Sequence, residues 1–354
     1  MYKIAKLDPI GYSGSMTTIL ETCPHVQSCG NCIRNDQTMD KQRTDQIGWL
    51  KRFLNLDSIE WVDSPKSMHY RSRVRFRVNK DGTMGYFKPK SHTLVPIDHC
   101  SIADESINAA LKGLDTVPFP AKTIEFRSNG TNVIANVSSL KGKRPTKDVL
   151  QTWAEGTLNG IGLDGHKMWG KCKTELEVCG VSHQFSLASF YQVNQGINAL
   201  LVETVRDWVL EHNPTQVLDL YCGAGNIGAA IALQGIKVVG MDSAPSSIQD
   251  AKQTIQRHSL PMEVFKKDAD KFEAGDAFFD VAVLDPPRKG CSGVISELQI
   301  TRPKAIVYVS CNPNALRNDL KEAKKHGYIP TRIKAFDMFP HTHHVETLVE
   351  LRRG

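Results

Sequence analysis

The sequence predicts a two-domain protein in which an α/β domain with a doubly wound, mostly parallel sheet follows a smaller β-rich α+β domain. From about residue 190 onward, short runs rich in Val, Ile and Leu alternate with helical patterns, which is typical of a parallel sheet covered by helices. Before that point, extended segments are separated by turn-rich loops that contain Pro and Gly. We place the boundary between residues 185 and 186, so the predicted domains are 1–185 and 186–354.

The composition fits a cytoplasmic protein of two-domain size. The chain has 354 residues, of which 40% are hydrophobic and 23% charged. It lacks any run of roughly 18 apolar residues that could span a bilayer, and residues 1–12 lack the apolar core of a secretory signal. In a reducing cytoplasm we expect the nine cysteines to be thiols, metal ligands or catalytic groups rather than disulfides. The sequence indicates no obligate protein partner, and we expect a monomer.

In the first domain, four cysteines form a candidate metal site. Cys23, Cys29 and Cys32 have the spacing C-x5-C-x2-C, and Cys100 follows later in the chain. Three thiolates within ten residues and one more brought in by the fold suit either zinc or an iron–sulfur cluster. The spacing alone does not choose between these two, and unliganded surface thiols are the remaining alternative.

The strands expected in the first domain include one with an unusual row of arginines. In residues 68–79, arginines alternate with Val74, Phe76 and Val78, so one face of the strand carries guanidinium groups about 6.6 to 6.8 Å apart. This spacing is close to that of phosphates along a nucleic acid and indicates a polyanion, although a solvated face paired with carboxylates is the alternative. The net charge of +6 permits such a partner. The arginines are Arg71, Arg73, Arg75 and Arg77, and the other expected strands are 85–88, 122–127, 133–137 and 175–178.

The elements of the second domain follow from its apolar runs. Four short runs rich in β-branched residues are expected to be strands buried on both faces. Helices are expected between them, and two final extended segments should form an antiparallel pair that closes the edge of the sheet. The expected strands are 216–220, 237–241, 280–284 and 305–310, the helices 226–233, 246–258 and 315–326, and the final pair 332–338 and 346–352.

A glycine-rich turn follows the first of these strands. Gly223 and Gly225 would let the backbone approach a ligand closely, and Gly228 would let the next helix pack tightly on its strand. The second strand ends at Asp242, where a carboxylate can accept hydrogen bonds from both hydroxyls of a ribose. The pattern indicates a nucleoside cofactor, either NAD or S-adenosylmethionine, with simple turn glycines as the alternative.

The loop after the strand expected at 280–284 favours S-adenosylmethionine. Asp285-Pro286-Pro287-Arg288 would project Asp285 over the carboxyl edge of the sheet, where ligands of such sheets bind. This loop is typical of enzymes that methylate nucleic-acid bases. The alternative for Asp285 is a cap at the end of its strand.

Two further residues at this edge are candidates for catalysis. Cys311 follows a buried strand just before a helix, where backbone N–H groups would favour its thiolate; a reduced core cysteine is the alternative. Glu346 lies in the loop between the two last strands and could accept a proton, or it could be a solvated hairpin glutamate. The neighbouring histidines do not match an established metal-ligand spacing.

These motifs together resemble the RNA uracil-C5 methyltransferase family. The similar segments are 188–194, the Gly223 turn, 285–288, 310–313 and 339–346. The resemblance implies a Rossmann-like class I methyltransferase domain that uses S-adenosylmethionine. Cys311 would add to C6 of uracil, and Glu346 would remove the C5 proton after methyl transfer. The uridine would be in a loop or flipped out. By the same resemblance the cofactor site would contain Gln192, Tyr221, Gly223, Asn226, Asp242, Asp268 and Asp285.

The resemblance also extends to the first domain. Iron–sulfur members of the family share the C-x5-C-x2-C spacing with a distant fourth cysteine, which implies a 4Fe-4S cluster here, with zinc as the less favoured occupant. The arginine strand is similar to the family's Y-R-x-R-x-R segment and implies RNA binding. Only twenty-two residues precede Cys23, so the additional β-barrel of many relatives is expected to be absent. This set of features is similar to bacterial enzymes that methylate 23S rRNA.

Other functions remain open. A transfer-RNA T-loop uridine is the alternative target within the family. From other classes, we retain a non-catalytic iron–sulfur RNA-binding protein and a nicotinamide-dependent oxidoreductase.

Overall fold

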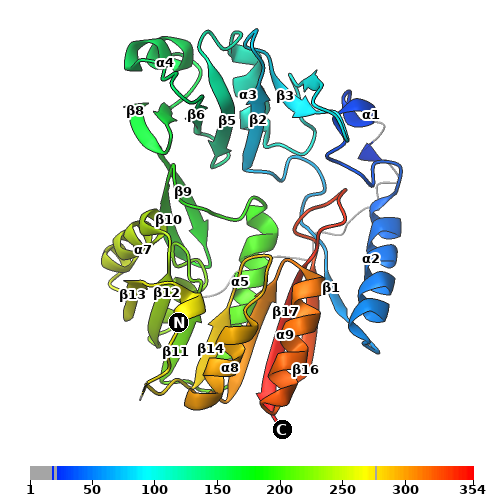
Figure 1. Ribbon diagram of the computed structural model, residues 1–354, viewed down its shortest axis with the longest axis vertical. Helices are drawn as coiled ribbons and strands as arrows, with labels where there is room; N and C mark the ends of the chain where they lie inside the picture. The colour runs from blue at the N-terminus through cyan, green and yellow to red at the C-terminus, as the bar shows by residue number, and fades with distance from the viewer. Residues whose placement is uncertain (1–17, 20–21, 276) are drawn as a thin grey trace, which may run out of the picture.

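The computed structural model describes residues 18–19, 22–275 and 277–354. These residues form an eight-stranded sheet, a seven-stranded sheet and a two-stranded hairpin (Figure 1). Residues 1–12, in which we predicted no secretory signal, and the start of the predicted domain 1–185 lie outside the described residues. None of the helices that the structure describes is long and apolar enough to cross a membrane.

The eight-stranded sheet is mostly parallel, as predicted. Its order is β1-β16-β17-β15-β14-β11-β12-β13, and β17 runs antiparallel to both of its neighbours. The strands are β1 (Glu60–Val62), β11 (Gln216–Leu220), β12 (Lys237–Asp242), β13 (Met262–Lys266), β14 (Val281–Leu284), β15 (Ala305–Ser310), β16 (Tyr328–Phe336) and β17 (Glu346–Arg353).

The predicted antiparallel pair is present as β16 and β17, but the expectation that it closes the sheet is wrong. β17 lies between β15 and β16, and β1 from the first half of the chain pairs in parallel with β16 and takes the edge. β1 has only three residues, and its partner lies more than 270 residues further along the chain. A segment this short carries no periodic pattern that a sequence can reveal.

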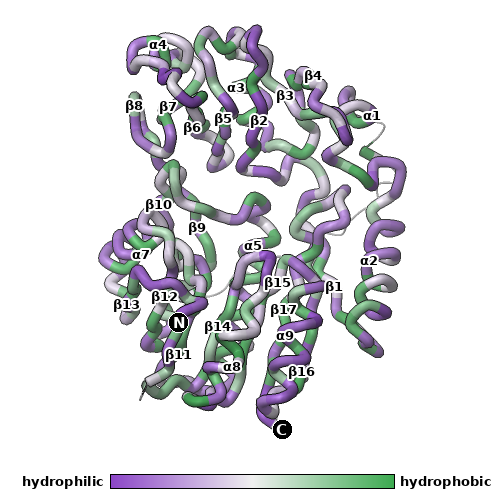
Figure 2. The backbone as a smooth tube through the Cα atoms, viewed as in Figure 1, coloured by the Kyte–Doolittle hydropathy of each residue, from purple (hydrophilic) through white to green (hydrophobic). Residues whose placement is uncertain are grey.

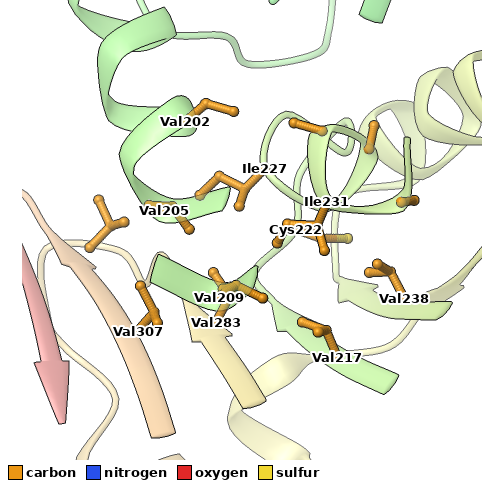
Figure 3. Packing of buried hydrophobic residues seen from close by; sticks show 14 of the residues in the cluster. Val202, Val205, Val209, Val217, Cys222, Ile227, Ile231, Val238, Val283 and Val307 are labelled. Carbon is orange, nitrogen blue, oxygen red and sulfur yellow. The ribbon is translucent and has the colours of Figure 1, made fainter. Parts of the chain in front are cut away.

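Helices cover both faces of this sheet. Val217, Val283 and Val307 pack toward α5 and α6 on one face (Figure 3), while their neighbours Leu218 and Ile306 pack with α8 on the other. Both faces are therefore buried, which explains the continuous apolar runs. Hydrophobic residues gather along these strands, and hydrophilic residues lie on outer helices such as α7 (Figure 2). The helices are α2 (Met39–Leu54), α5 (Gln195–Leu210), α6 (Gly228–Ala232), α7 (Pro245–His258), α8 (Ser292–Thr301) and α9 (Pro313–Lys325).

The seven-stranded sheet forms the upper half of the molecule in Figure 1, with the order β4-β3-β2-β5-β6-β7-β8. Helices α3 and α4 pack with it around a separate core that includes Phe76, Phe126 and Leu150. The elements are α1 (Val26–Cys29), β2 (Arg73–Val78), β3 (Met84–Phe87), β4 (Leu94–Pro96), α3 (Glu105–Gly113), β5 (Ala121–Ser128), β6 (Val133–Ser139), α4 (Lys147–Ala154), β7 (Gly160–Leu163) and β8 (His166–Gly170).

The predicted strand 175–178 belongs to a separate hairpin rather than to this sheet. It forms β9 (Lys173–Val178), which pairs with β10 (Val181–Ser186). The hairpin packs on α7. The N–H of Ser182 donates to His258 (3.1 Å), and the N–H of Ser186 donates to Asp250 (2.8 Å). The division at residues 185 and 186 stays a prediction.

Candidate active site

The candidate catalytic residues lie together at one edge of the eight-stranded sheet. Asp285 follows β14 and Cys311 follows β15, so both lie at the carboxyl ends of parallel strands. β17 runs in the opposite direction and begins at this same edge with Glu346. Ser310 pairs with Thr347 in the β15–β17 register, and the Thr347 hydroxyl donates to the Ser310 carbonyl (3.1 Å). Cys311 and Glu346 are therefore neighbours across the pair.

The glycine turn has the geometry expected of a ligand-binding turn. Gly223 and Gly225 have φ values of +54° and +83°, in the left-handed region that glycine favours. The Gly223 N–H donates to the Asp242 carboxylate (3.0 Å), which joins the turn to the end of β12. A Cβ at residue 223 would have no atom within 4 Å, whereas one at Gly228 would lie 2.5 Å from Asp219 Oδ2. The predicted packing role of Gly228 is confirmed.

Polar side chains surround this turn. The Tyr221 hydroxyl donates to Asp270 (2.6 Å), which also pairs with Lys289. Asn226 and Asn198 exchange hydrogen bonds through their side-chain amides (2.9 and 3.2 Å). Asp268 accepts from the Asp270 N–H (3.1 Å) at the start of a short 3₁₀ helix after β13.

Gln192 lies in the segment before α5, and its neighbour Tyr191 is buried in one cluster with Phe185 and with Ala224 of the glycine turn. Of the residues predicted for the cofactor, the structure gathers Tyr221, Gly223, Asn226 and Asp242 around one turn. Gln192 follows Tyr191 in the chain, and its predicted contact with the cofactor stays a prediction.

The carboxyl groups at this edge have raised pKa values. Burial raises the pKa of Asp285 to about 7, and the charge of Asp242 acts in the same direction. Burial, followed by the charge of Asp285, raises the pKa of Glu346 well above its usual value, while Arg288 opposes the shift. Glu346 is only 3% exposed, which rules out a solvated hairpin glutamate. A buried carboxylate with a raised pKa is a stronger base than one in water.

The pKa of Cys311 differs from the sequence prediction. Burial and the charges of Glu346 and Asp285 raise the pKa of this thiol to about 11, although Arg288 lowers it. The backbone N–H of Cys311 lowers this pKa, as expected, but burial and the two carboxyl groups outweigh it, so the net shift is upward. The side chain of Asn312 accepts from the Asn314 N–H (3.1 Å), so the first turn of α9 is capped by Asn312. With a pKa of about 11, the Cys311 thiol of the free site is protonated at neutral pH.

The four predicted metal ligands lie around one cavity of about 560 Å³, although α2 and the strands β1 to β4 lie between Cys32 and Cys100 in the chain. His25 bonds Asp98 (2.7 Å) and thereby holds the segment of Cys23 and Cys29 beside the loop of Cys100. Burial and the neighbouring thiols raise the pKa of Cys32 to about 12. A bound cation would relieve this repulsion between thiolates.

The described cysteine site is not arranged as a metal centre. Among residues 18–19, 22–275 and 277–354, no three His, Cys, Asp or Glu side chains are arranged to hold one metal ion. Backbone N–H groups of Ile102 and Ala103 point at the Cys100 sulfur, and Asn31 donates to that of Cys29 (3.3 Å). Such hydrogen bonds stabilise a thiolate whether it binds zinc or an iron–sulfur cluster.

The arginine strand alternates as predicted, but its charges are not all free. Val74 and Phe76 are buried, while Arg75 and Arg77 are exposed. Arg75 donates to Glu125 (Nε to Oε2, 2.9 Å), which also binds the buried Arg127. The alternative that carboxylates partly neutralise this face is therefore correct for Arg75.

Arg71 and Arg73 differ from the expected row. Arg71 precedes β2, and its guanidinium carbon lies 5.6 Å from the centre of the Phe339 ring. The guanidinium of Arg73 lies over the ring of Phe190 at 4.6 Å. Phe190 is 56% exposed and was not predicted as a site residue. Asp270 and Lys289 were not predicted as site residues either. Their contact joins two separate loops, so no local sequence pattern indicates it.

Comparisons with known proteins agree with this geometry. Residues 172–354 match the model of the tRNA (uracil-5-)-methyltransferase family. An uncharacterized RNA methyltransferase from Clostridium tetani is 28% identical, and the match covers 94% of this chain and 83% of that protein. The crystal structure of Pyrococcus abyssi tRNA (uracil-54, C5)-methyltransferase in complex with S-adenosyl-L-homocysteine is 26% identical, has a TM-score of 0.76, and covers 92% of this chain and 86% of that chain.

Proposed function

The chain belongs to the tRNA (uracil-5-)-methyltransferase family, and we propose that it transfers a methyl group from S-adenosylmethionine to C5 of a specific uridine in RNA. The observation that carries this proposal is the proximity of Cys311 and Glu346, which lie next to the Ser310–Thr347 pair of β15 and β17 at the carboxyl edge of the sheet. The glycine turn opens toward the same edge, as a cofactor site must.

The chemistry needs both residues. C5 of uracil is a weak nucleophile, so addition of the Cys311 thiolate to C6 would place electron density on C5. The bound cofactor supplies the methyl group. C5 then carries a methyl group and a hydrogen, and Glu346 would accept that proton so that the thiolate can leave C6. The raised pKa of Glu346 supports this role, because it makes the carboxylate a stronger base.

The residues proposed to bind the cofactor are those around the glycine turn, together with Asp285 and Asp268. Asp242 already uses its two carboxylate oxygens to accept from the N–H groups of Gly223 (3.0 Å) and Ala244 (2.7 Å), so ribose hydroxyls would add to an anchored carboxylate. The S-adenosyl-L-homocysteine complex of the Pyrococcus abyssi relative supports the choice of cofactor.

We also propose that Cys23, Cys29, Cys32 and Cys100 hold a 4Fe-4S cluster, and that RNA lies along Arg71, Arg73, Arg75 and Arg77. The cavity that the four cysteines line also contains Arg71 and Arg73, so the two sites adjoin. In this proposal residues 1–185 bind the cluster and RNA, and residues 186–354 carry out catalysis. Iron and sulfide content after anaerobic purification, with zinc measured in the same sample, tests the cluster.

The RNA target is proposed separately. The cysteine set favours 23S rRNA, whereas the similarity to a tRNA (uracil-54, C5)-methyltransferase over most of the chain favours a tRNA uridine as second candidate. Mapping of 5-methyluridine in rRNA and tRNA from cells that lack the protein separates the two. Loss of the modification from one RNA identifies the target.

Substitution of Cys311 and of Glu346 tests the proposed reaction. Cys311→Ala should abolish methyl transfer while S-adenosylhomocysteine binding is kept. Glu346→Gln should accumulate a covalent RNA–protein adduct that survives denaturing electrophoresis, because elimination stalls. Cys179→Ala, at a half-buried cysteine away from this edge, is the matched control and should turn over normally. Retained turnover by Cys311→Ala would refute the proposed nucleophile.

A further inference from the structure

The loop between β16 and β17 delivers Glu346 to the site, and its conformation is unusual. His341 in this loop has φ +68°, a left-handed conformation that a residue with a Cβ seldom adopts. Such a conformation is unfavourable for a residue with a Cβ and persists only where the surrounding structure holds it. His341 is only 3% exposed, so the restraint has to come from the protein interior.

The restraint on His341 comes from Gln42 in α2. The Gln42 side-chain amide accepts from the His341 N–H (2.9 Å), and its Nε2 lies 3.2 Å from His341 Nδ1. The same Nε2 lies 2.9 Å from the Gln37 carbonyl and 3.2 Å from that of Arg34. Gln42 therefore joins the backbone and the ring of His341 to the segment before α2.

Three further contacts hold the same loop. The Arg34 N–H donates to the His341 carbonyl (3.1 Å), and Gln46, one turn after Gln42, donates to the Thr342 carbonyl (3.0 Å). The Tyr70 hydroxyl donates to the Pro340 carbonyl (3.1 Å). The carbonyls of residues 340, 341 and 342 are thus all bound by side chains or backbone from the first half of the chain.

The restrained residues lie directly before the proposed base. Val345 packs in one buried cluster with Leu50 of α2, and Glu346 is the first residue of β17. Gln42 and Gln46 are 3% and 4% exposed, so replacing either by an apolar residue of similar size adds no new contact with solvent. Without their hydrogen bonds, the loop next to Glu346 loses part of what holds His341 in the left-handed conformation.

We propose that Gln42, assisted by Gln46, is a positioning residue for catalysis that holds the loop 339–345 and thereby sets the place of Glu346 relative to Cys311. This inference rests on the proposed function. Gln42 touches neither the proposed base nor the nucleophile, so its effect passes through His341. The step it serves is proton removal from C5, and not cofactor binding or the addition of Cys311.

The test compares Gln42→Leu and Gln46→Leu with the parent protein on the same RNA. We expect Gln42→Leu to lower kcat by about 10- to 100-fold, because small displacements of reacting groups have effects of this size. The equilibrium affinities for RNA and for S-adenosylhomocysteine should stay within about twofold, because neither site is contacted. The KM for RNA should fall together with kcat, because the slowed step follows adduct formation. Gln46→Leu releases only one carbonyl and should lower kcat in the same direction by less.

The distinguishing measurement is the covalent adduct. Because elimination is the slowed step, Gln42→Leu should accumulate RNA–protein adduct during turnover, as Glu346→Gln does. Gln42→Glu keeps an acceptor for the His341 N–H and should restore part of kcat. Ile124→Val, in the separate core of the seven-stranded sheet, serves as a control for loss of stability and should show no adduct.

Each outcome decides the inference. Turnover of Gln42→Leu at the parent rate would overturn the positioning role. A low kcat of Gln42→Leu without adduct, when Glu346→Gln does form adduct, would also overturn it. Both outcomes leave the proposed function standing. If Glu346→Gln itself forms no adduct, the assignment of the base fails, and this inference fails with it. If Gln42→Leu has a thermal midpoint far below that of Ile124→Val, Gln46→Leu decides by the same two measurements.

Discussion

Two glycines of the cofactor turn can be used to separate ligand approach from helix packing. An Ala at residue 223 meets no atom within 4 Å, but it has to adopt φ +54°. The conformational cost is about 1 kcal/mol. An Ala at residue 228 would place its Cβ 2.5 Å from Asp219 Oδ2 and 2.7 Å from Met262 Cε. Asp219 is 1% exposed and cannot move into solvent, so the cost is that of overpacking, about 1–3 kcal/mol.

For binding of S-adenosylhomocysteine, we expect the larger loss from the substitution at Gly223 and the smaller loss from the substitution at Gly228. The open space beside Gly223 is where the proposed cofactor approaches, so we expect Gly223→Ala to weaken binding at least about tenfold. At a ligand concentration of 100 Kd the parent protein gains about 2.7 kcal/mol of stability, and a tenfold weaker variant gains about 1.4 kcal/mol. Gly228→Ala should lose stability without ligand but keep most of the ligand-induced gain.

Chemical unfolding with and without S-adenosylhomocysteine measures both quantities, and calorimetric titration checks the affinities. A Gly223→Ala protein with the full ligand-induced gain would refute the placement of the cofactor at this turn. A Gly228→Ala protein as stable as the parent would refute the packing argument for Asp219.

Three further predictions follow from charges in the structure. Because the pKa of Cys311 is raised to about 11, its alkylation by iodoacetamide should accelerate about tenfold per pH unit from pH 7 to 10; a plateau below pH 9, seen by mass spectrometry of its peptide, would contradict this. Glu125→Gln leaves the buried Arg127 without its carboxylate partner and should lower the free energy of unfolding by about 3–5 kcal/mol. Glu177→Gln, at an exposed site, should change this free energy little. Equal effects of the two substitutions would refute the importance of the Glu125–Arg127 pair. Arg77→Ala should reduce by about one the slope of the logarithm of RNA affinity against the logarithm of salt concentration, and an unchanged slope, as expected for Arg206→Ala, would remove Arg77 from the RNA surface.

The second half of the chain could be predicted closely because its strands are buried on both faces. Strands 216–220 and 305–310 match β11 and β15 at every residue. The contribution of β1 to the sheet could not be predicted, because three residues give no period and their pairing with β16 depends on the tertiary fold. The same holds for Gln42, whose partner His341 is 299 residues away.

The site was predictable in its residue types and less so in its electrostatics. Motif spacing predicts four cysteines, which line one cavity, and it predicts Cys311 and Glu346, which lie at one edge of the sheet; their roles stay predictions. The direction of the Cys311 pKa shift was predicted wrongly, because burial and the approach of Glu346 outweigh nearby backbone dipoles. Burial is a property of the assembled sheet edge and has no local signature in the sequence.

The raised pKa values at this edge indicate how a bound cofactor would change the ionisation of the site under the proposed function. Asp219 and Asp285 have pKa values raised to about 8 and about 7, chiefly by burial, and Glu346 is shifted in the same direction. Ionisation of these groups and of Cys311 becomes more favourable when a positive charge lies nearby, as Arg288 already demonstrates for Cys311 and Glu346. A sulfonium at the glycine turn would act in this direction, whereas RNA phosphates would oppose it. Under the proposed function, cofactor binding should therefore favour ionisation of both the Cys311 thiol and the Glu346 carboxyl group.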